Sequence, residues 1–149
     1  MKKIETAPAP ADARVHVRWL GEQRFDMGDA NGPRSRIDAS EETGPGPIGA
    51  LLGALATCAA IDVLAMLTKA RTPVESLTVD VTGERVPTIP RRLRRITLHY
   101  SIRGAGIERA LAERAVALAL ATYCSVRGSL NPGIAIESTV TVTGAVPSA

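Results

Sequence analysis

The sequence predicts a single α+β domain, and three observations support this fold class. Its 149 residues are 45% hydrophobic, which suits one domain with a real core and leaves too little chain for two. Several short segments alternate apolar and polar residues, as half-buried strands do. Two longer segments are apolar and rich in alanine, which favours helices. We expect this domain to span residues 14–145, between a flexible tail at 1–13 and a short tail at 146–149.

The first part of the chain predicts strands. Val15, Val17 and Trp19 alternate with polar residues, so the period-2 pattern predicts a strand near residues 14–20. Phe25 and Met27 mark a second strand after a turn. A weaker third strand is expected at residues 35–39, before a segment dense in glycine and proline.

The segment at residues 48–67 predicts a helix that is apolar on nearly every face, with Asp62 as its only charge. Pro47 suits a first helical turn, where its missing N–H costs nothing. A helix of this length is either buried or spans a membrane, and an aspartate at a membrane centre costs about 2.5 kcal/mol or more. We favour the buried helix and interpret Asp62 as a buried, hydrogen-bonded structural acid rather than a catalytic base.

The second half of the chain continues with strands and a second helix. Alternation at 77–82 and 95–102 predicts two strands joined by a proline-bearing hairpin. A helix is expected after Gly106, apolar over residues 115–121, and a last strand over 134–142. Each cysteine therefore lies on or just after one of the two apolar helical segments.

Composition argues against several classes of function. The net charge is only +3 and aromatic residues make up 3% of the chain, so neither a basic footprint nor stacking platforms for nucleic acid are present. Four arginines could form a phosphate-binding patch, but we interpret them as a solvated hairpin end: Arg91, Arg92, Arg94 and Arg95. No nucleic-acid partner is expected.

Two cysteines are too few for a four-cysteine zinc site. His16 and His99 lie on the polar faces of predicted strands and receive no role, so no metal and no bound cofactor are expected. The N-terminus has no apolar signal segment, which predicts a cytoplasmic protein without a membrane partner. In the cytoplasm, cysteines that pair are usually transient and redox-active.

Two segments resemble the OsmC/Ohr family, which includes the organic hydroperoxide resistance proteins. Residues 44–62, from Gly44-Pro-Gly-Pro47 through Cys58 to Asp62, resemble the family's first-helix motif. Tyr123-Cys-Ser-Val126 and the following 131–136 resemble its second cysteine segment and its turn into the last strand. The resemblance covers roughly 15–142. It implies an intertwined homodimer in which curved antiparallel sheets wrap two central helices and the active sites lie at the subunit interface.

The resemblance implies a thiol peroxidase acting in oxidative or osmotic stress defence. Cys58 would be the peroxidatic cysteine and Cys124 the resolving cysteine, because a sulfenic acid can condense with a second thiol. A thiolate needs a nearby cation, and the resemblance implies that an arginine near the first hairpin supplies it. Arg24 is our candidate for this substrate-binding role, with Arg18 behind it. The expected substrate is an organic hydroperoxide, or hydrogen peroxide, and the expected reductant is an external dithiol.

One departure from the family pattern alters the activating network. Ile48 and Gly49 stand where the family commonly has a glutamate that pairs with the arginine. Glu41 or Glu42 could supply that carboxylate from the preceding loop. The alternative function is therefore an OsmC-like dimer with little peroxidase activity that binds a hydrophobic small molecule at its interface.

Overall fold

The computed structural model describes residues 10–144. Most of the predicted N-terminal tail and the whole predicted C-terminal tail lie outside the described residues. The chain divides into two compact units, one ending at Pro47 and the other beginning at Ile48. Each unit is described by itself, and the prediction of one domain over 14–145 stays a prediction.

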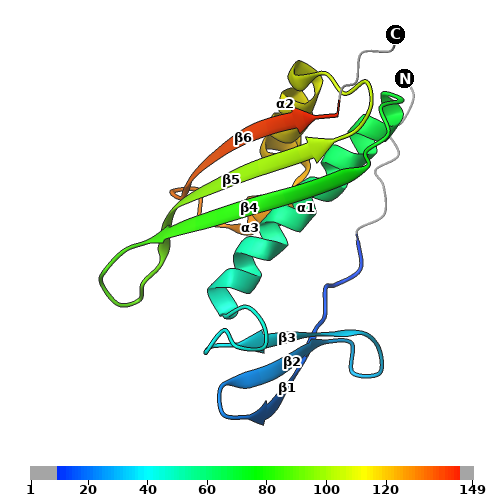
Figure 1. Ribbon diagram of the computed structural model, residues 1–149. Helices are drawn as coiled ribbons and strands as arrows, with labels where there is room; N and C mark the ends of the chain where they lie inside the picture. The colour runs from blue at the N-terminus through cyan, green and yellow to red at the C-terminus, as the bar shows by residue number, and fades with distance from the viewer. Residues whose placement is uncertain (1–9, 145–149) are drawn as a thin grey trace, which may run out of the picture. The chain divides into compact units, whose positions relative to one another are not determined.

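The first unit is a three-stranded antiparallel sheet with the order β1-β2-β3. Its strands are β1 (His16–Gly21), β2 (Arg24–Gly28) and β3 (Arg34–Asp38), as drawn in blue and cyan in Figure 1. All three strands expected from the sequence are therefore confirmed. The turn between β1 and β2 contains Glu22 at a φ of 50°, a left-handed conformation that strains most residues other than glycine.

Alternation along these strands gives the first sheet one apolar face and one charged face. Cross-strand partners on the apolar face include Trp19 with Phe25, and Phe25 with Ile37. In this chain Trp19 is 65% exposed and Val17 54% exposed. The opposite face carries ion pairs, among them Arg36 Nε to Asp26 Oδ1 at 2.7 Å.

The second unit contains helices and a second sheet. Helix α1 spans Pro47–Lys69 and opens at the proline expected from the sequence. The remaining elements are β4 (Ser76–Arg85), β5 (Leu93–Arg103), α2 (Arg109–Leu118), the π-helix η1 (Ala119–Tyr123), α3 (Ser125–Ser129) and β6 (Ala135–Thr143). The second predicted helix is thus three consecutive helical pieces.

The second sheet has the order β4-β5-β6 and is mixed. Strands β4 and β5 form an antiparallel hairpin, whereas β5 and β6 are parallel. The expectation of purely antiparallel sheets was therefore wrong for this pair. Parallel neighbours need a long crossover, and the helices between β5 and β6 provide it.

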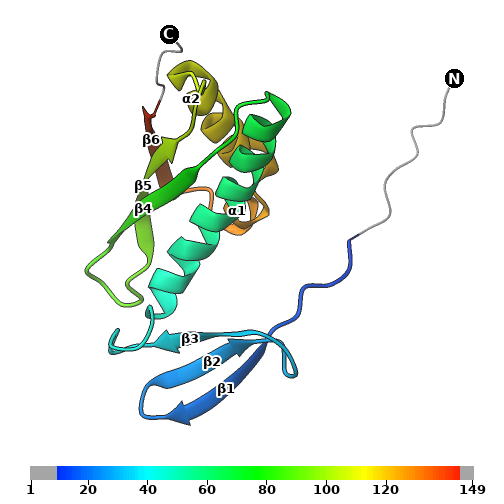
Figure 2. The same cartoon turned by 45° about the vertical axis from the view of Figure 1, so that its right-hand side comes forward.

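Helices α1 and α2 cover the same face of this sheet (Figure 2). On β5, Leu98, Tyr100 and Ile102 face the helices and are at most 1% exposed, while the residues between them are polar. The sheet-facing side of α1 contributes fully buried aliphatic residues: Leu55, Ala59, Val63 and Leu67. The core of the second unit is therefore aliphatic, as the composition predicts, with Tyr100 as its one aromatic member among the described residues.

By length and composition alone, α1 is a helix that could cross a membrane, and 33% of its most apolar stretch is buried. Core helices of soluble proteins meet the same criteria. Its packing on the second sheet supports the buried-helix interpretation, and the expectation of no membrane partner stays a prediction.

Candidate functional site

Cys58 lies in the middle of α1 and is half-buried against the core of the second unit. The small residue Ala59 follows it and is fully buried, so the helix approaches its neighbours closely here. Position 58 is too far from the first turn for the helix dipole to act on its thiol. Any stabilisation of a Cys58 thiolate must therefore come from side chains or other backbone groups.

Cys124 lies at a break in the second helical segment, between η1 and α3. Its backbone is extended, with φ −70° and ψ 104°, and its N–H donates to Ala119 O at 2.8 Å. The sulfur accepts a hydrogen bond from the backbone N–H of Arg127 at 3.3 Å and lies 4.0 Å from Leu55 O of α1. The break thus turns the Cys124 thiol, 5% exposed, toward the helix that carries Cys58.

The two thiols interact with each other. Burial raises the pKa of the Cys124 thiol, and the backbone N–H of Arg127 partly opposes this effect. The neighbouring Cys58 thiol raises the pKa of Cys124 further. The structure therefore brings together the two cysteines predicted to act as a pair. Both are free thiols in this state.

A buried tyrosine lies close enough to respond to Cys124. Tyr100 is 0% exposed, and its hydroxyl makes no hydrogen bond within the described part of the chain. Burial raises the pKa of Tyr100 to about 12, and the charge of Cys124 contributes to the shift. The hydroxyl is consequently protonated at neutral pH and retains an unused donor.

A cavity of about 380 Å³ opens beside Cys124. Its walls come from the second helical segment and the turn that follows: Leu120, Ala121, Thr122, Cys124, Arg127, Gly128, Leu130 and Pro132. Arg127 was missed by sequence reasoning, although its position three residues after Cys124 places it one helical turn away. It is the only charged residue among the described residues that line this cavity.

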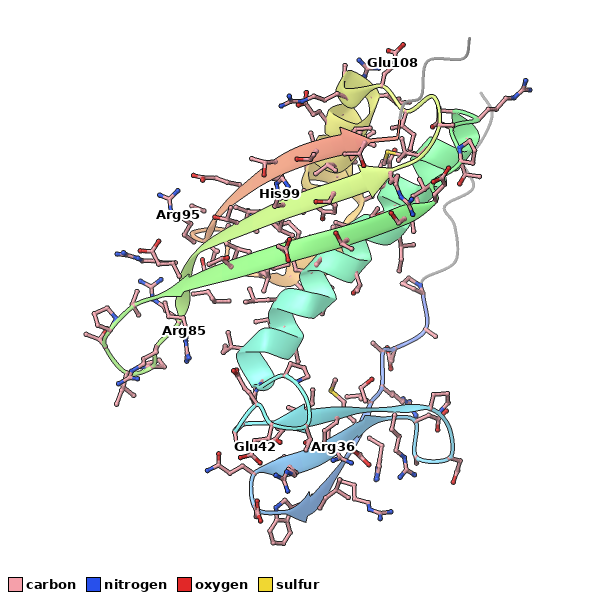
Figure 3. All side chains as sticks on the ribbon, viewed as in Figure 1. Arg36, Glu42, Arg85, Arg95, His99 and Glu108 are labelled. Carbon is pink, nitrogen blue, oxygen red and sulfur yellow. The ribbon has the colours of Figure 1, made fainter. Side chains whose placement is uncertain are left out.

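Arg24 is held by carboxylates within the first unit. Its Nε contacts Asp38 Oδ2 at 3.2 Å, and its Nη2 contacts Glu42 Oε2 at 2.8 Å. A weaker contact joins its Nη1 to Glu22 Oε2 at 3.6 Å. The hydrogen bond with Asp38 is the largest cause of a raised pKa of Arg24, and the charges of its acidic partners add to it. Of the two carboxylates proposed to replace the missing family glutamate, Glu42 is the one that pairs with Arg24, and Figure 3 labels it in the loop after β3.

Asp38 was not singled out from the sequence, yet it anchors this cluster. Its carboxylate is 0% exposed and accepts bonds from the backbone N–H and hydroxyl of both Ser40 and Thr43, at 2.7–3.0 Å. The Ser40 and Thr43 hydroxyls are the main reason that the pKa of Asp38 lies far below its usual range. The Asp38 carboxylate, ionised at neutral pH, therefore keeps Arg24 in place.

Arg24 belongs to the first unit and both cysteines to the second, so its predicted action on Cys58 stays a prediction. Arg18, the second candidate, is exposed. It makes no ion pair with any residue between 10 and 144.

Two further residues considered from the sequence are Asp62 and His99. Asp62 is half-buried and accepts no hydrogen bond from the described residues, which corrects its interpretation as a buried, hydrogen-bonded acid. The reason is its place at the edge of the buried face of α1, where the core does not enclose it. His99 contacts Thr139 Oγ1 at 2.6 Å and Thr141 Oγ1 at 3.2 Å on the polar face of that sheet, where Figure 3 labels it.

The arginine cluster is a solvated hairpin end, as interpreted from the sequence. All four arginines are exposed. Arg94 pairs with Glu84, and Arg95 pairs with Glu137, so half of the cluster is already neutralised. Among the described residues, no group of three or more histidine, cysteine or acidic side chains could hold a metal ion.

The sequence model of the OsmC-like protein family matches residues 39–139, which include both cysteines. The chain belongs to the OsmC-like family. Among curated proteins it is 32% identical to protein YhfA of Escherichia coli K12 over 133 residues, or 89% of this chain and 99% of YhfA.

Solved structures share the OsmC-like fold. An OsmC-like protein from Mycoplasma pneumoniae superposes with a TM-score of 0.72 at 20% identity, covering 92% of this chain and 99% of that one. An organic hydroperoxide resistance protein OsmC from Legionella pneumophila has a TM-score of 0.65 at 16% identity, covering 89% and 100%. The expected family and α+β fold are therefore confirmed. The first turn of α1 contains no acidic residue in this chain.

We predict that Asp38→Asn lowers the melting temperature at pH 7 by about 5 °C. The amide carries no charge for Arg24 and cannot accept all four bonds from Ser40 and Thr43. Because the folded pKa of Asp38 is lowered, its contribution is complete above the ordinary pKa of about 4 and is lost as the pH falls further. Thermal unfolding followed by circular dichroism should therefore show that the melting temperature falls more steeply with decreasing pH in the wild type than in Asp38→Asn.

Asp29→Asn is the matched control for this experiment. Asp29 is an exposed turn residue whose Oδ1 accepts from Asn31 N at 3.1 Å, a bond that an asparagine oxygen can keep. Equal melting temperatures for Asp38→Asn and Asp29→Asn at neutral pH would contradict the proposed anchoring role.

We predict that Tyr100→Phe raises the free energy of unfolding by about 1 kcal/mol, because it removes a buried hydroxyl without a partner. Wild type should also lose stability as the pH rises from 10 through about 12, the raised pKa of Tyr100, and Tyr100→Phe should lack this step. Urea unfolding measures both effects. Tyr123→Phe, at a residue 57% exposed, is the control, and a loss of stability in Tyr100→Phe would mean that the hydroxyl has a partner.

Proposed function

We propose that this protein is a thiol peroxidase that reduces organic hydroperoxides through Cys58 and Cys124. The observation that supports the proposal is the position of the Cys124 sulfur, 4.0 Å from Leu55 O on the helix that carries Cys58. Membership of the OsmC-like family and the name of the Legionella pneumophila structure, an organic hydroperoxide resistance protein, point the same way.

The surroundings of the two thiols support different roles. Cys124 is buried and its pKa is raised, so little of it is ionised at neutral pH, and it suits a resolving thiol that acts second. Cys58 is half-buried and is the more accessible of the two to a peroxide. We therefore assign the first attack to Cys58.

The proposed reaction has two covalent steps. The Cys58 thiolate attacks the distal oxygen of the hydroperoxide, the O–O bond breaks, and the alkoxide leaves as the alcohol after taking a proton. Cys58 is then a sulfenic acid. The Cys124 sulfur attacks it, the S–O bond breaks, and water and the disulfide form. An external dithiol supplies the two electrons and two protons that restore both thiols.

Arg24 is our proposed peroxide-binding residue. Its guanidinium is fixed by Asp38 and Glu42, and a guanidinium held in this way can direct its remaining N–H groups at a peroxide oxygen. Glu42 would take the place of the family glutamate that Ile48 and Gly49 lack. The apolar surroundings of the thiols favour an organic peroxide over hydrogen peroxide.

The rival function is a binding protein for a hydrophobic small molecule. The observation that favours it is the absence of an acidic residue from the first turn of α1. A protein of this kind would keep the dimer and its pocket but would reduce peroxides slowly.

We also propose that the protein is a homodimer in the cytoplasm. One face of the first sheet consists of apolar side chains that are largely exposed, including Val17, Trp19 and Phe25. On α1, Ile61 is 66% exposed. Exposed apolar side chains gathered on one face of a sheet mark an interface, and a second copy covering the face of the first sheet would also compensate for the small aliphatic core.

The peroxidase proposal predicts rapid oxidation of Cys58 by cumene hydroperoxide in a stopped-flow experiment. Cys58→Ser should reduce peroxide consumption to the background rate. Cys124→Ser should keep the first oxidation but accumulate sulfenic acid and then sulfinic acid, because the resolving step is absent. If Cys58 in the wild type reacts no faster than free cysteine, the binding-protein function is favoured instead.

The dimer proposal predicts that Trp19→Glu weakens self-association at least about 30-fold, as expected for a buried aromatic at an interface. Sedimentation equilibrium measures the dissociation constant. Ile89→Glu, at a residue 89% exposed in the β4–β5 hairpin, should leave it unchanged. A wild-type protein that is monomeric at high micromolar concentration would contradict the homodimer.

A further inference from the structure

The β4–β5 hairpin ends in a tip, residues 85–92, that extends beyond the three-stranded part of the second sheet. Strand β6 pairs with β5 only from Arg95 onward, so the hairpin continues past the start of β6 (Figure 1). Leu93 at the base of the tip is buried in the core. Within the tip itself, every residue except the half-buried Val86 is exposed. The hairpin is therefore anchored at its base and presents the side chains of its tip to the surroundings.

Hydrogen bonds within the tip fix its backbone. The N–H of Val86 donates to Arg92 O at 2.9 Å, and the N–H of Arg92 donates to Pro90 O at 2.8 Å. The side chain of Arg85, which Figure 3 labels where β4 ends, donates from Nε to Arg91 O at 2.8 Å. A loop held in this way can bind a partner with little further loss of chain entropy.

The tip is cationic and its charge is not neutralised. It contains three arginines and no acidic residue: Arg85, Arg91 and Arg92. None of the three makes an ion pair with any residue between 10 and 144, because the adjacent Glu84 is already paired with Arg94 and Arg95. Three free guanidinium groups on one short loop are complementary to a surface that carries several anionic groups.

An exposed aliphatic side chain lies between these cations in the sequence. Ile89 is 89% exposed, the highest value for any large apolar residue in the part of the chain that the structure describes. Pro87 and Pro90 on either side of it are exposed as well. A single exposed aliphatic residue is common on soluble proteins, so it is the combination with flanking arginines that indicates a particular partner.

We propose that the hairpin tip docks the protein on an anionic lipid surface, with Ile89 inserted among the acyl chains and the three arginines in contact with lipid phosphates. Arginine side chains suit this position because their aliphatic part can lie along apolar material while the guanidinium stays in the headgroup layer. The expectation of no membrane partner rested on the absence of a signal segment and on a buried α1. Neither observation concerns the hairpin.

The same features fit a nucleic acid or an acidic protein less well. The tip contains no aromatic residue that could stack on bases, and a phosphate backbone would leave Ile89 in water. A standard protein interface buries about 800 Å² on each partner, which is more than a loop of this size presents. A lipid surface is the partner that uses the apolar and the cationic side chains together.

This docking goes beyond the proposed function and does not depend on it. The two proposals are nevertheless compatible, because hydroperoxides of unsaturated acyl chains are organic hydroperoxides. A protein held at a lipid surface would be close to a source of the proposed substrate.

The test is co-sedimentation of the full chain with two kinds of vesicle, phosphatidylcholine alone and phosphatidylcholine mixed with phosphatidylglycerol. We expect binding to the anionic vesicles only. The double variant Arg91→Gln/Arg92→Gln should bind them about 25-fold more weakly, since each basic residue near an anionic surface contributes about fivefold. High salt should weaken wild-type binding in the same way.

A matched double variant separates the tip from the net charge of the protein. Arg109→Gln/Arg114→Gln removes the same charge from α2, where both arginines are exposed, and should leave vesicle binding almost unchanged. Equal losses in the two double variants would overturn the proposal, because any part of the surface would then serve. A wild-type chain that does not sediment with anionic vesicles would also overturn it.

The inserted side chain has its own test. Ile89→Ser should weaken binding about fivefold, the effect of partly burying one aliphatic side chain. Ile89→Trp should bind, and anionic vesicles should shift its fluorescence to shorter wavelength, whereas the wild type, with Trp19 alone, should show no such shift. If the arginine variants lose binding but neither substitution of Ile89 has its effect, the tip does not insert and the proposal is wrong.

A double-stranded oligonucleotide tests the other anionic partner. Fluorescence anisotropy should show no binding at a salt concentration at which the anionic vesicles are bound. Binding of the oligonucleotide but not of the vesicles, lost in Arg91→Gln/Arg92→Gln, would replace the lipid surface with nucleic acid. None of these measurements involves a peroxide, so their outcome is independent of the peroxidase proposal.

Discussion

The contact between the Cys124 segment and α1 is the interaction on which the proposed chemistry depends. The chain leaves η1 in an extended conformation at Cys124, and this break aims the sulfur at Leu55 O of α1 and at the Cys58 thiol. In a continuous helix, the direction of each side chain is fixed by a turn of about 100° per residue. The extended backbone at Cys124 frees its side chain from that constraint. The small residues on both segments permit the close approach, and burial in an aliphatic core sets the high pKa of Cys124.

Arg24 of the first unit and Arg127 of the second differ in their acidic partners. In the first unit, an ionised and fully buried Asp38 holds Arg24, and Glu42 shares the guanidinium. In the second unit, the cavity beside Cys124 contains an arginine with no acidic partner among the described residues. A guanidinium held in place by carboxylates suits the orientation of an uncharged peroxide, as proposed for Arg24.

Much of the fold could be predicted from local patterns. Alternation located the strands to within a few residues, and the apolar segment after Pro47 located α1, because both depend on neighbours in sequence. The parallel pairing of β5 with β6 could not be predicted, since it depends on how α2, η1 and α3 return the chain to the sheet. The same limit applied to Asp62, whose hydrogen bonding depends on which side of α1 faces the core, and that side is set by packing.

For the candidate site, the sequence by itself determined the two cysteines, the family and the absence of an acidic residue at the start of α1. These are properties of residue identity and spacing. Only the tertiary structure decided that the two thiols interact, that Glu42 rather than Glu41 pairs with Arg24, and that Arg127 shares a cavity with Cys124. The physical reason is that pKa shifts, ion pairs and cavities arise from groups that are close in space. Folding alone sets those distances.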